Sequence, residues 1–135
     1  MHRRILSVFA GLIAAILVFI AFEWVNSLFY PFPKHIDIAD QEATTAYIKT
    51  LPNTAFILVL MGWAAGSFVC GLLIRLISRS ASKISAYISG LLLMTAGIVN
   101  MFSIEHPTWF IVIGLFCFVP FTLLGHYAGK QKNAA

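Results

Sequence analysis

Four long apolar runs constrain this chain more than any other feature of its sequence. The runs cover residues 5–25, 54–74, 84–104 and 109–127. Each has about the 20 residues that an α-helix needs to cross the ~30 Å hydrocarbon core of a bilayer. Only 10% of the 135 residues are charged, whereas a soluble domain carries roughly 25%. The sequence therefore predicts an all-α integral membrane protein, a four-helix bundle that forms a single domain over residues 1–135.

The first run follows a basic start, Arg3 and Arg4, as the apolar core of a secretory signal peptide also does. The apolar region of a signal peptide is shorter, about 7–15 residues, and small residues mark its cleavage site. Residues 21–24, Ala-Phe-Glu-Trp, make a poor cleavage site. We therefore expect the first run to be an uncleaved transmembrane helix.

The polar segment after the first run carries a helix signal of its own. It covers residues 26–53, contains three prolines, and predicts a short helix over residues 36–49. Asp37 or Asp40 can cap this helix, because aspartate side chains accept hydrogen bonds from the free N–H groups of a first turn. Small and weakly polar residues share one face of it, so we expect the helix to lie at the membrane interface.

The other connections are short. Residues 75–83 form a loop between the second and third runs, and residues 105–108 leave room only for a tight turn between the third and fourth. Pro107 ends one helix and Thr108 is placed to cap the next. We therefore expect the third and fourth spans to be antiparallel neighbours.

The charges predict the orientation of the bundle. Seven basic residues flank the runs at one end: Arg3, Arg4, Arg75, Arg79, Lys83, Lys130 and Lys132. The opposite end has only Lys34 and Lys49, with every carboxylate of the chain. Short basic loops stay in the cytoplasm, so both termini and the 75–83 loop are predicted to be cytoplasmic. The net charge of +4 then reflects orientation, and no nucleic-acid partner is expected.

Small residues are predicted to hold the helices together, because lipid tails are as apolar as leucine and helix association depends on close packing. The glycines expected at helix contacts are Gly11, Gly62, Gly66, Gly71, Gly90 and Gly97. Gly62 and Gly66 form a GxxxG motif, which suits packing within the chain or between two copies. Gly125 and Gly129 follow near the end of the fourth run and are expected to close its helix.

Glu23 is the only carboxylate within a predicted span. Ionisable groups at membrane depth are costly and commonly functional. Glu23 is also expected about one turn from the end of its helix, where it can reach the interface. An interfacial role and a proton- or cation-handling role both stay open.

A second candidate is a polar cluster on the outer face. Its members besides Glu23 are His35, Asp37, Asp40, Glu105 and His106. Imidazole and carboxylate groups suit a divalent cation or general acid–base chemistry. The spacing of these residues matches no metal motif, and solvated loop charges and helix caps account for most of them. We therefore assign no metal site and no cofactor.

No catalytic residue is assigned either. The sequence has no Ser/His/Asp or Cys/His arrangement, no phosphate-binding glycine loop and no CxxC pair. Cys70 and Cys117 both fall inside apolar runs, at depths too different for a disulfide, and neither has a histidine beside it. The balance is against an enzyme.

Several short motifs together resemble a known group of proteins. They are Pro31-Phe-Pro-Lys-His-Ile-Asp37, Asp40-Gln-Glu42, Leu51-Pro52, Gly62-Trp63, Gly66, Gly71, His106-Pro107-Thr-Trp109-Phe110, Pro120 and Gly125. As a set they resemble uncharacterised bacterial inner-membrane proteins of about 130 residues. The resemblance implies a bacterial cytoplasmic membrane and the same four-helix plan, and it brings no activity.

Three classes of function follow from these observations. The first is a non-enzymatic component that packs with, or assists, a membrane partner. The second is a small homo-oligomeric transporter or channel that uses Glu23 and Asn100. The third is a metal-binding or enzymatic site on the outer face. The lipid bilayer is the one partner common to all three.

Overall fold

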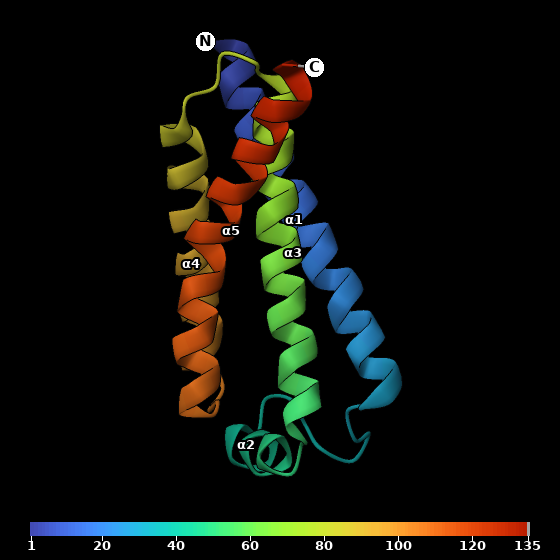
Figure 1. Ribbon diagram of the computed structural model, residues 1–135. Helices are drawn as coiled ribbons and strands as arrows, with labels where there is room; N and C mark the ends of the chain where they lie inside the picture. Colours follow the sequence, from blue (N-terminus) through green and yellow to red (C-terminus); the bar gives the residue numbers. More distant parts are fainter. Residues whose placement is uncertain (135) are drawn as a thin grey trace.

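The computed structural model describes residues 1–134, with side chains through Lys130, and this part of the chain forms five helices and no strand. The helices are α1 (His2–Phe29), α2 (Gln41–Lys49), α3 (Asn53–Ile77), α4 (Lys83–Ser103) and α5 (Thr108–Ala134). Figure 1 shows α1, α3, α4 and α5 side by side along one axis, with α2 at one end. Those four helices are long and apolar enough to cross a membrane, which supports a multi-pass membrane protein.

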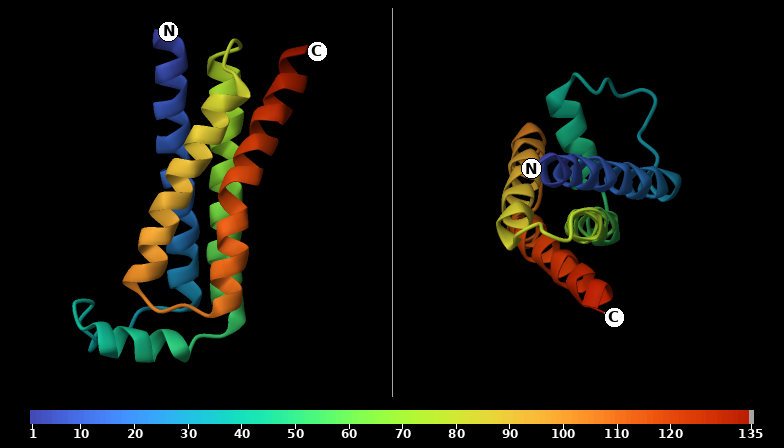
Figure 2. Two further views of the ribbon diagram at one scale, coloured as in Figure 1. Left: turned by 90° about the vertical axis from the view of Figure 1, so that its left-hand side faces the viewer. Right: turned by 90° about the horizontal axis from the view of Figure 1, so that it is seen from above.

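Helix α3 is the centre of the bundle. It packs against α1 on one side and α5 on the other, and α4 packs mainly against α5. Both the start of α1 and the end of α5 lie at the same end of the bundle, on different sides of it, and α2 lies across the opposite end (Figures 1 and 2). The antiparallel pairing of the last two long helices is confirmed, because residues 104–107 between them span only a tight connection.

The short helix begins later than the sequence predicts. Turns occupy the preceding residues, with the Ile36 N–H donating to the Pro33 carbonyl and the Asp40 N–H to the Asp37 carbonyl. The Asp40 side chain is the N-cap, since its Oδ1 accepts from the Ala43 N–H at 3.1 Å. The helix is therefore Gln41–Lys49 and not 36–49, and the Asp37 carboxylate instead closes a turn by accepting from the Ala39 N–H at 2.9 Å.

The end of α1 and the start of α5 are among the helix ends that differ from the prediction. Helix α1 continues through Phe29, and the Tyr30 N–H still bonds to the Asn26 carbonyl. Glu23 therefore lies six residues before the helix ends, nearly two turns and not one. At the start of α5, the Pro107 carbonyl accepts hydrogen bonds from the Phe110 and Ile111 N–H groups. Thr108 is the first residue of α5, so the prediction that it caps this helix is wrong.

Glycines allow α3 to approach both of its main neighbours closely. A Cβ atom added to Gly62 would lie 2.7 Å from the Phe22 Cβ, and one on Gly66 would lie 2.9 Å from the Ala15 carbonyl oxygen. The GxxxG motif thus packs against α1 within the chain. On the other side, a Cβ on Gly71 would meet the Thr122 backbone and one on Gly125 the Phe68 backbone.

The remaining glycines lie at further helix contacts. Gly11 abuts the Cys70 carbonyl, Gly90 faces Val119, and Gly97 lies against the Phe118 ring. Gly125 and Gly129 lie inside α5, where they contact α3, so the expectation that they close this helix is wrong. Helix α5 also contains Pro120 and bends part-way along its length (Figure 2), as expected where a backbone hydrogen bond is lost.

Candidate functional site

A cavity of about 520 Å³ lies among α1, α3, α4 and α5, in the half of the bundle nearer α2. Most of its wall is apolar. Four polar side chains line it: Glu23, Asn26, Asn100 and His106. They come from α1, α4 and the connection between α4 and α5, so distant parts of the sequence meet here.

Helical spacing places these side chains toward the cavity. On α1, Glu23 and Asn26 lie three residues apart and share a face with Phe19, which also lines the cavity. On α4, Asn100 follows Gly97 by the same interval, and both line the cavity. One polar patch on α1 and one on α4 therefore border the same space.

The cavity occupies the space left where α1 and α4 diverge. Helix α1 stays packed on α3 as far as Phe22, which lies against Gly62, while the C-terminal part of α1 lies apart from α4 (Figures 1 and 2). Aromatic rings close the inner end of the space. The Phe118 ring lies 5.1 Å from that of Trp63 and 6.5 Å from that of Phe19, centroid to centroid. Bulky rings at this level thus support the cavity floor.

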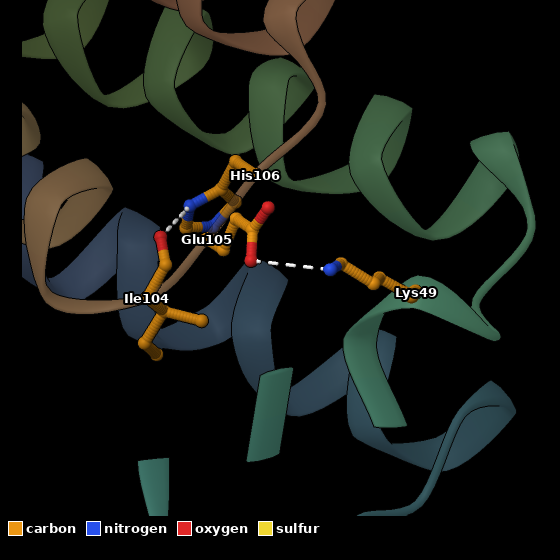
Figure 3. Close-up of polar contacts among 4 residues, drawn as sticks. All are labelled: Lys49, Ile104, Glu105 and His106. Atoms are coloured by element: carbon orange, nitrogen blue, oxygen red, sulfur yellow. Dashed lines mark hydrogen bonds and ion pairs between the residues drawn. The ribbon is translucent and has the colours of Figure 1, made fainter. Parts of the chain in front are cut away.

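His106 lines the cavity from the connection between α4 and α5, and several contacts hold its ring in place. Its Nδ1–H donates to the Ile104 carbonyl at 2.6 Å (Figure 3). Its ring stacks on Phe110 with centroids 4.8 Å apart and an interplanar angle of 11°, and the edge of Phe56 completes the contact at 6.3 Å. The imidazole is therefore fixed in orientation beside the cavity.

The α1 groups have few partners within the protein. Among residues 1–134, the Glu23 carboxylate forms no hydrogen bond and no ion pair. The Asn26 Oδ1 is buried and also has no hydrogen-bond partner in the described chain. Buried polar atoms are nearly always hydrogen-bonded in folded proteins. Of these two groups, only the Asn26 Oδ1 is a buried atom that lacks a partner, whereas the Glu23 residue is exposed and its carboxylate is accessible to a ligand that enters the cavity.

The other predicted outer-face residues lie elsewhere. His35, Asp37 and Asp40 are exposed and do not line the cavity. The Glu105 carboxylate points to Lys49, with Oε2 and Nζ 3.3 Å apart (Figure 3). Within the described residues, no group of three or more His, Cys, Asp or Glu side chains could hold a metal ion. The predicted cluster is therefore divided, with only Glu23 and His106 at the cavity.

Asn26 is the cavity residue that the sequence analysis does not single out. The apolar run ends at Val25, so the sequence predicts Asn26 in the following loop. The available signal was the three-residue interval from Glu23, which matters only if the helix continues. Helix α1 does continue, and Asn26 is thereby placed on the same face.

No family model matches this chain, and neither a curated protein nor a solved structure matches it. Its function is therefore inferred from the geometry and chemistry of the cavity.

Proposed function

We propose that this chain is a multi-pass protein of the bacterial cytoplasmic membrane that binds a small amphipathic cation in the cavity bordered by α1 and α4. The observation that carries the proposal is the Glu23 carboxylate, which has no partner among the described residues, on the wall of a mostly apolar cavity. The volume of about 520 Å³ is within the roughly 300–1,000 Å³ of small-molecule sites.

Charge complementarity supports a cationic ligand. Two unit charges 4 Å apart attract by about 4 kcal/mol at the effective dielectric near a protein surface. Glu23 is the only acidic side chain on the cavity wall, and no lysine or arginine lines it. Asn26 and Asn100 can orient polar groups of the ligand.

The apolar wall supports a ligand with a large hydrocarbon or aromatic part. Phe56, Trp63 and Phe110 all line the cavity, and their rings pack against one another at 5.1–5.6 Å. Aromatic faces attract cations as well as apolar groups. A small inorganic cation would leave most of this surface without a partner.

The orientation that we propose places the cavity in the outer half of the membrane. Seven of the nine lysine and arginine residues flank the helices at the end that holds both termini. The positive-inside rule assigns that end to the cytoplasm. Helix α2, across the opposite end, then lies at the outer interface. The bacterial cytoplasmic membrane itself is proposed from the resemblance noted in the sequence.

Cation binding favours the transporter among the three classes of function. A carboxylate on a membrane-spanning helix that faces a mostly apolar cavity is costly without a counter-charge, and a bound cation would supply that charge. The metal-binding class has no set of three or more His, Cys, Asp or Glu ligands among the described residues. Four helices seldom enclose a complete path, so the transporter would act as a homo-oligomer.

Binding of a model hydrophobic cation tests the proposal. We expect purified protein in nanodiscs to bind tetraphenylphosphonium in equilibrium dialysis, and to bind neutral triphenylphosphine oxide much more weakly. Glu23→Gln should weaken cation binding roughly tenfold or more, because it removes the attraction between opposite charges and a tenfold change in affinity requires only about 1.4 kcal/mol. Glu42→Gln is the matched control, because Glu42 is exposed in the first turn of α2 and does not line the cavity.

Two results would contradict the proposal. One is the absence of saturable tetraphenylphosphonium binding by the wild-type protein. The other is equal affinity of wild type and Glu23→Gln, provided that both proteins elute as folded material from size-exclusion chromatography. In either case the component that packs with a membrane partner becomes the better interpretation.

A further inference from the structure

A second cavity, of about 780 Å³, lies at the opposite end of the bundle. It is bordered by the end of α3, the connection to α4, and the C-terminal part of α5. It shares no lining residue with the first cavity, the one bordered by Glu23, hereafter the outer cavity. Its chemistry also differs, because its charged side chains are all basic.

Three basic residues border this second cavity: Arg75, Lys83 and Lys130. Arg75 is held at the wall, since its Nη1 donates to the Ala81 carbonyl at 2.9 Å. Both lysines are exposed, and neither forms an ion pair with a described side chain. No acidic side chain lines the cavity, and all five carboxylates of the side chains belong to the other half of the bundle. Like charges gathered in this way favour an anion between them.

His126 supplies an independent indication of a ligand. Its side chain lines the cavity and is 8% exposed. The Nδ1 atom is buried and has no hydrogen-bond partner among residues 1–134. Leaving a buried polar atom unsatisfied costs about 1–3 kcal/mol. A ligand with acceptor or donor oxygens would supply the missing partner.

Apart from Ser82, the rest of the wall is largely apolar, and it continues along one face of α5. Pro120, Leu123, Leu124 and Tyr127 line the cavity at helical intervals of three and four residues. Leu124 and Tyr127 are more than half exposed. The strip extends from the basic residues toward the middle of the helix, which is the direction that an acyl chain takes from its headgroup.

We propose that this second cavity binds an anionic phospholipid, with its headgroup phosphate among Lys83, Lys130 and His126 and an acyl chain along the Pro120–Tyr127 face of α5. Phosphate recognition alone would also fit a free phosphate ion. The apolar strip favours the lipid, because a free ion would leave it uncovered. Basic pockets between helices at the cytoplasmic membrane surface commonly hold anionic headgroups. The proposal does not depend on cation binding at the outer cavity.

Native mass spectrometry of the protein in neutral detergent tests this proposal. We expect wild-type protein to retain dioleoyl-phosphatidylglycerol at lower lipid concentration than dioleoyl-phosphatidylcholine. Lys83→Gln with Lys130→Gln should weaken phosphatidylglycerol binding roughly 25-fold, because each lysine near an anionic headgroup contributes about 1 kcal/mol, or about fivefold. Lys34→Gln with Lys49→Gln removes the same charge at the other end and should leave the affinity within about twofold.

Thermal unfolding provides the second measurement. Phosphatidylglycerol should raise the melting temperature of wild-type protein, and inorganic phosphate at the same concentration should not. The charge-keeping pair Lys83→Arg and Lys130→Arg should retain the effect, which separates lost binding from lost folding. Equal binding of the two lipids would overturn the proposal, as would equal losses in the two lysine-to-glutamine pairs. A full shift with inorganic phosphate alone would replace the lipid with a free anion.

Discussion

The Nζ atom of Lys49 and the Oε2 atom of Glu105 lie 3.3 Å apart and connect the end of α2 to the hairpin between α4 and α5. The side chains are 64% and 61% exposed, respectively. Helix α2 is also held by Ile48, which packs against the hydrophobic core, and by the Tyr47 hydroxyl, which donates to the Pro31 carbonyl at 3.0 Å. Among the described residues, this exposed pair is the one ion pair between the short helix and the hairpin, and apolar packing of Ile48 adds to it.

Breaking this ion pair should have a small effect on stability. Exposed pairs contribute about 0.2–1 kcal/mol, so Glu105→Gln should lower the free energy of unfolding by less than about 1 kcal/mol. The difference should shrink at high salt, because screening weakens exposed charges. Unfolding of detergent-solubilised protein by added dodecyl sulfate measures it, with Glu42→Gln as control. A loss above about 2 kcal/mol would show that the pair is not solvated as the structure indicates.

His106 should contribute to stability through two separable contacts. His106→Phe keeps a ring beside Phe110 but removes the hydrogen bond to the Ile104 carbonyl, and should cost about 1 kcal/mol. His106→Ala also removes the ring stack, which adds about 0.5–1.5 kcal/mol. The same unfolding measurement should rank wild type above His106→Phe, and His106→Phe above His106→Ala. Equal stabilities for the two variants would mean that the stack contributes nothing.

The contact between α3 and α5 should tolerate a methyl group at one glycine better than at another. A Cβ on Gly125 would overlap the Phe68 backbone carbonyl, whereas on Gly129 the nearest atom would be the Arg75 Cβ at 2.9 Å, a much milder contact. Gly125→Ala should therefore destabilise the protein by about 1–3 kcal/mol through overpacking. Gly129→Ala is the matched comparison and should cost less. The opposite order would contradict this packing.

The proposed orientation can be tested by labelling single introduced cysteines in intact cells. Asp37→Cys, in the exposed loop before α2, should react with a membrane-impermeant maleimide. Ser80→Cys, between α3 and α4, should react only after the membrane is opened. The native Cys70 and Cys117 are free and buried, so wild-type protein is expected to give little background. Labelling of Ser80→Cys but not Asp37→Cys in intact cells would reverse the orientation.

The elements of this fold were largely predictable because they follow from local sequence. Apolar runs of about 20 residues predict four long helices, and the Pro107 turn predicts that α4 and α5 are neighbours. The errors lie at helix ends. Asn26 and Phe29 extend α1 beyond its apolar run, and Pro107 with Thr108 begins α5 one residue earlier than a threonine cap allows. The apolar run indicates which residues lie among lipid tails, but a helix ends where its backbone hydrogen bonds end, and the two limits differ by several residues.

The site was predictable only in part. Glu23 is conspicuous in the sequence as a carboxylate within an apolar run, and His106 as a histidine beside the hairpin proline. Nothing local relates them to each other, or to Asn26 and Asn100. The sequence equally suggested that His35 and Asp37 would join them, and the structure leaves those two exposed in the loop.

The sequence by itself determined that this chain has four helices able to cross a membrane, with its basic residues concentrated at one end and its acids at the other. Only the tertiary structure decided that α1 leans away from α4, so that Glu23, Asn26, Asn100 and His106 border one cavity. The physical reason is the solvent. Lipid tails are as apolar as leucine, so hydropathy does not distinguish a helix face against lipid from one against protein. Close contacts at glycines such as Gly66 and Gly125 make that distinction, and those contacts join residues far apart in the chain.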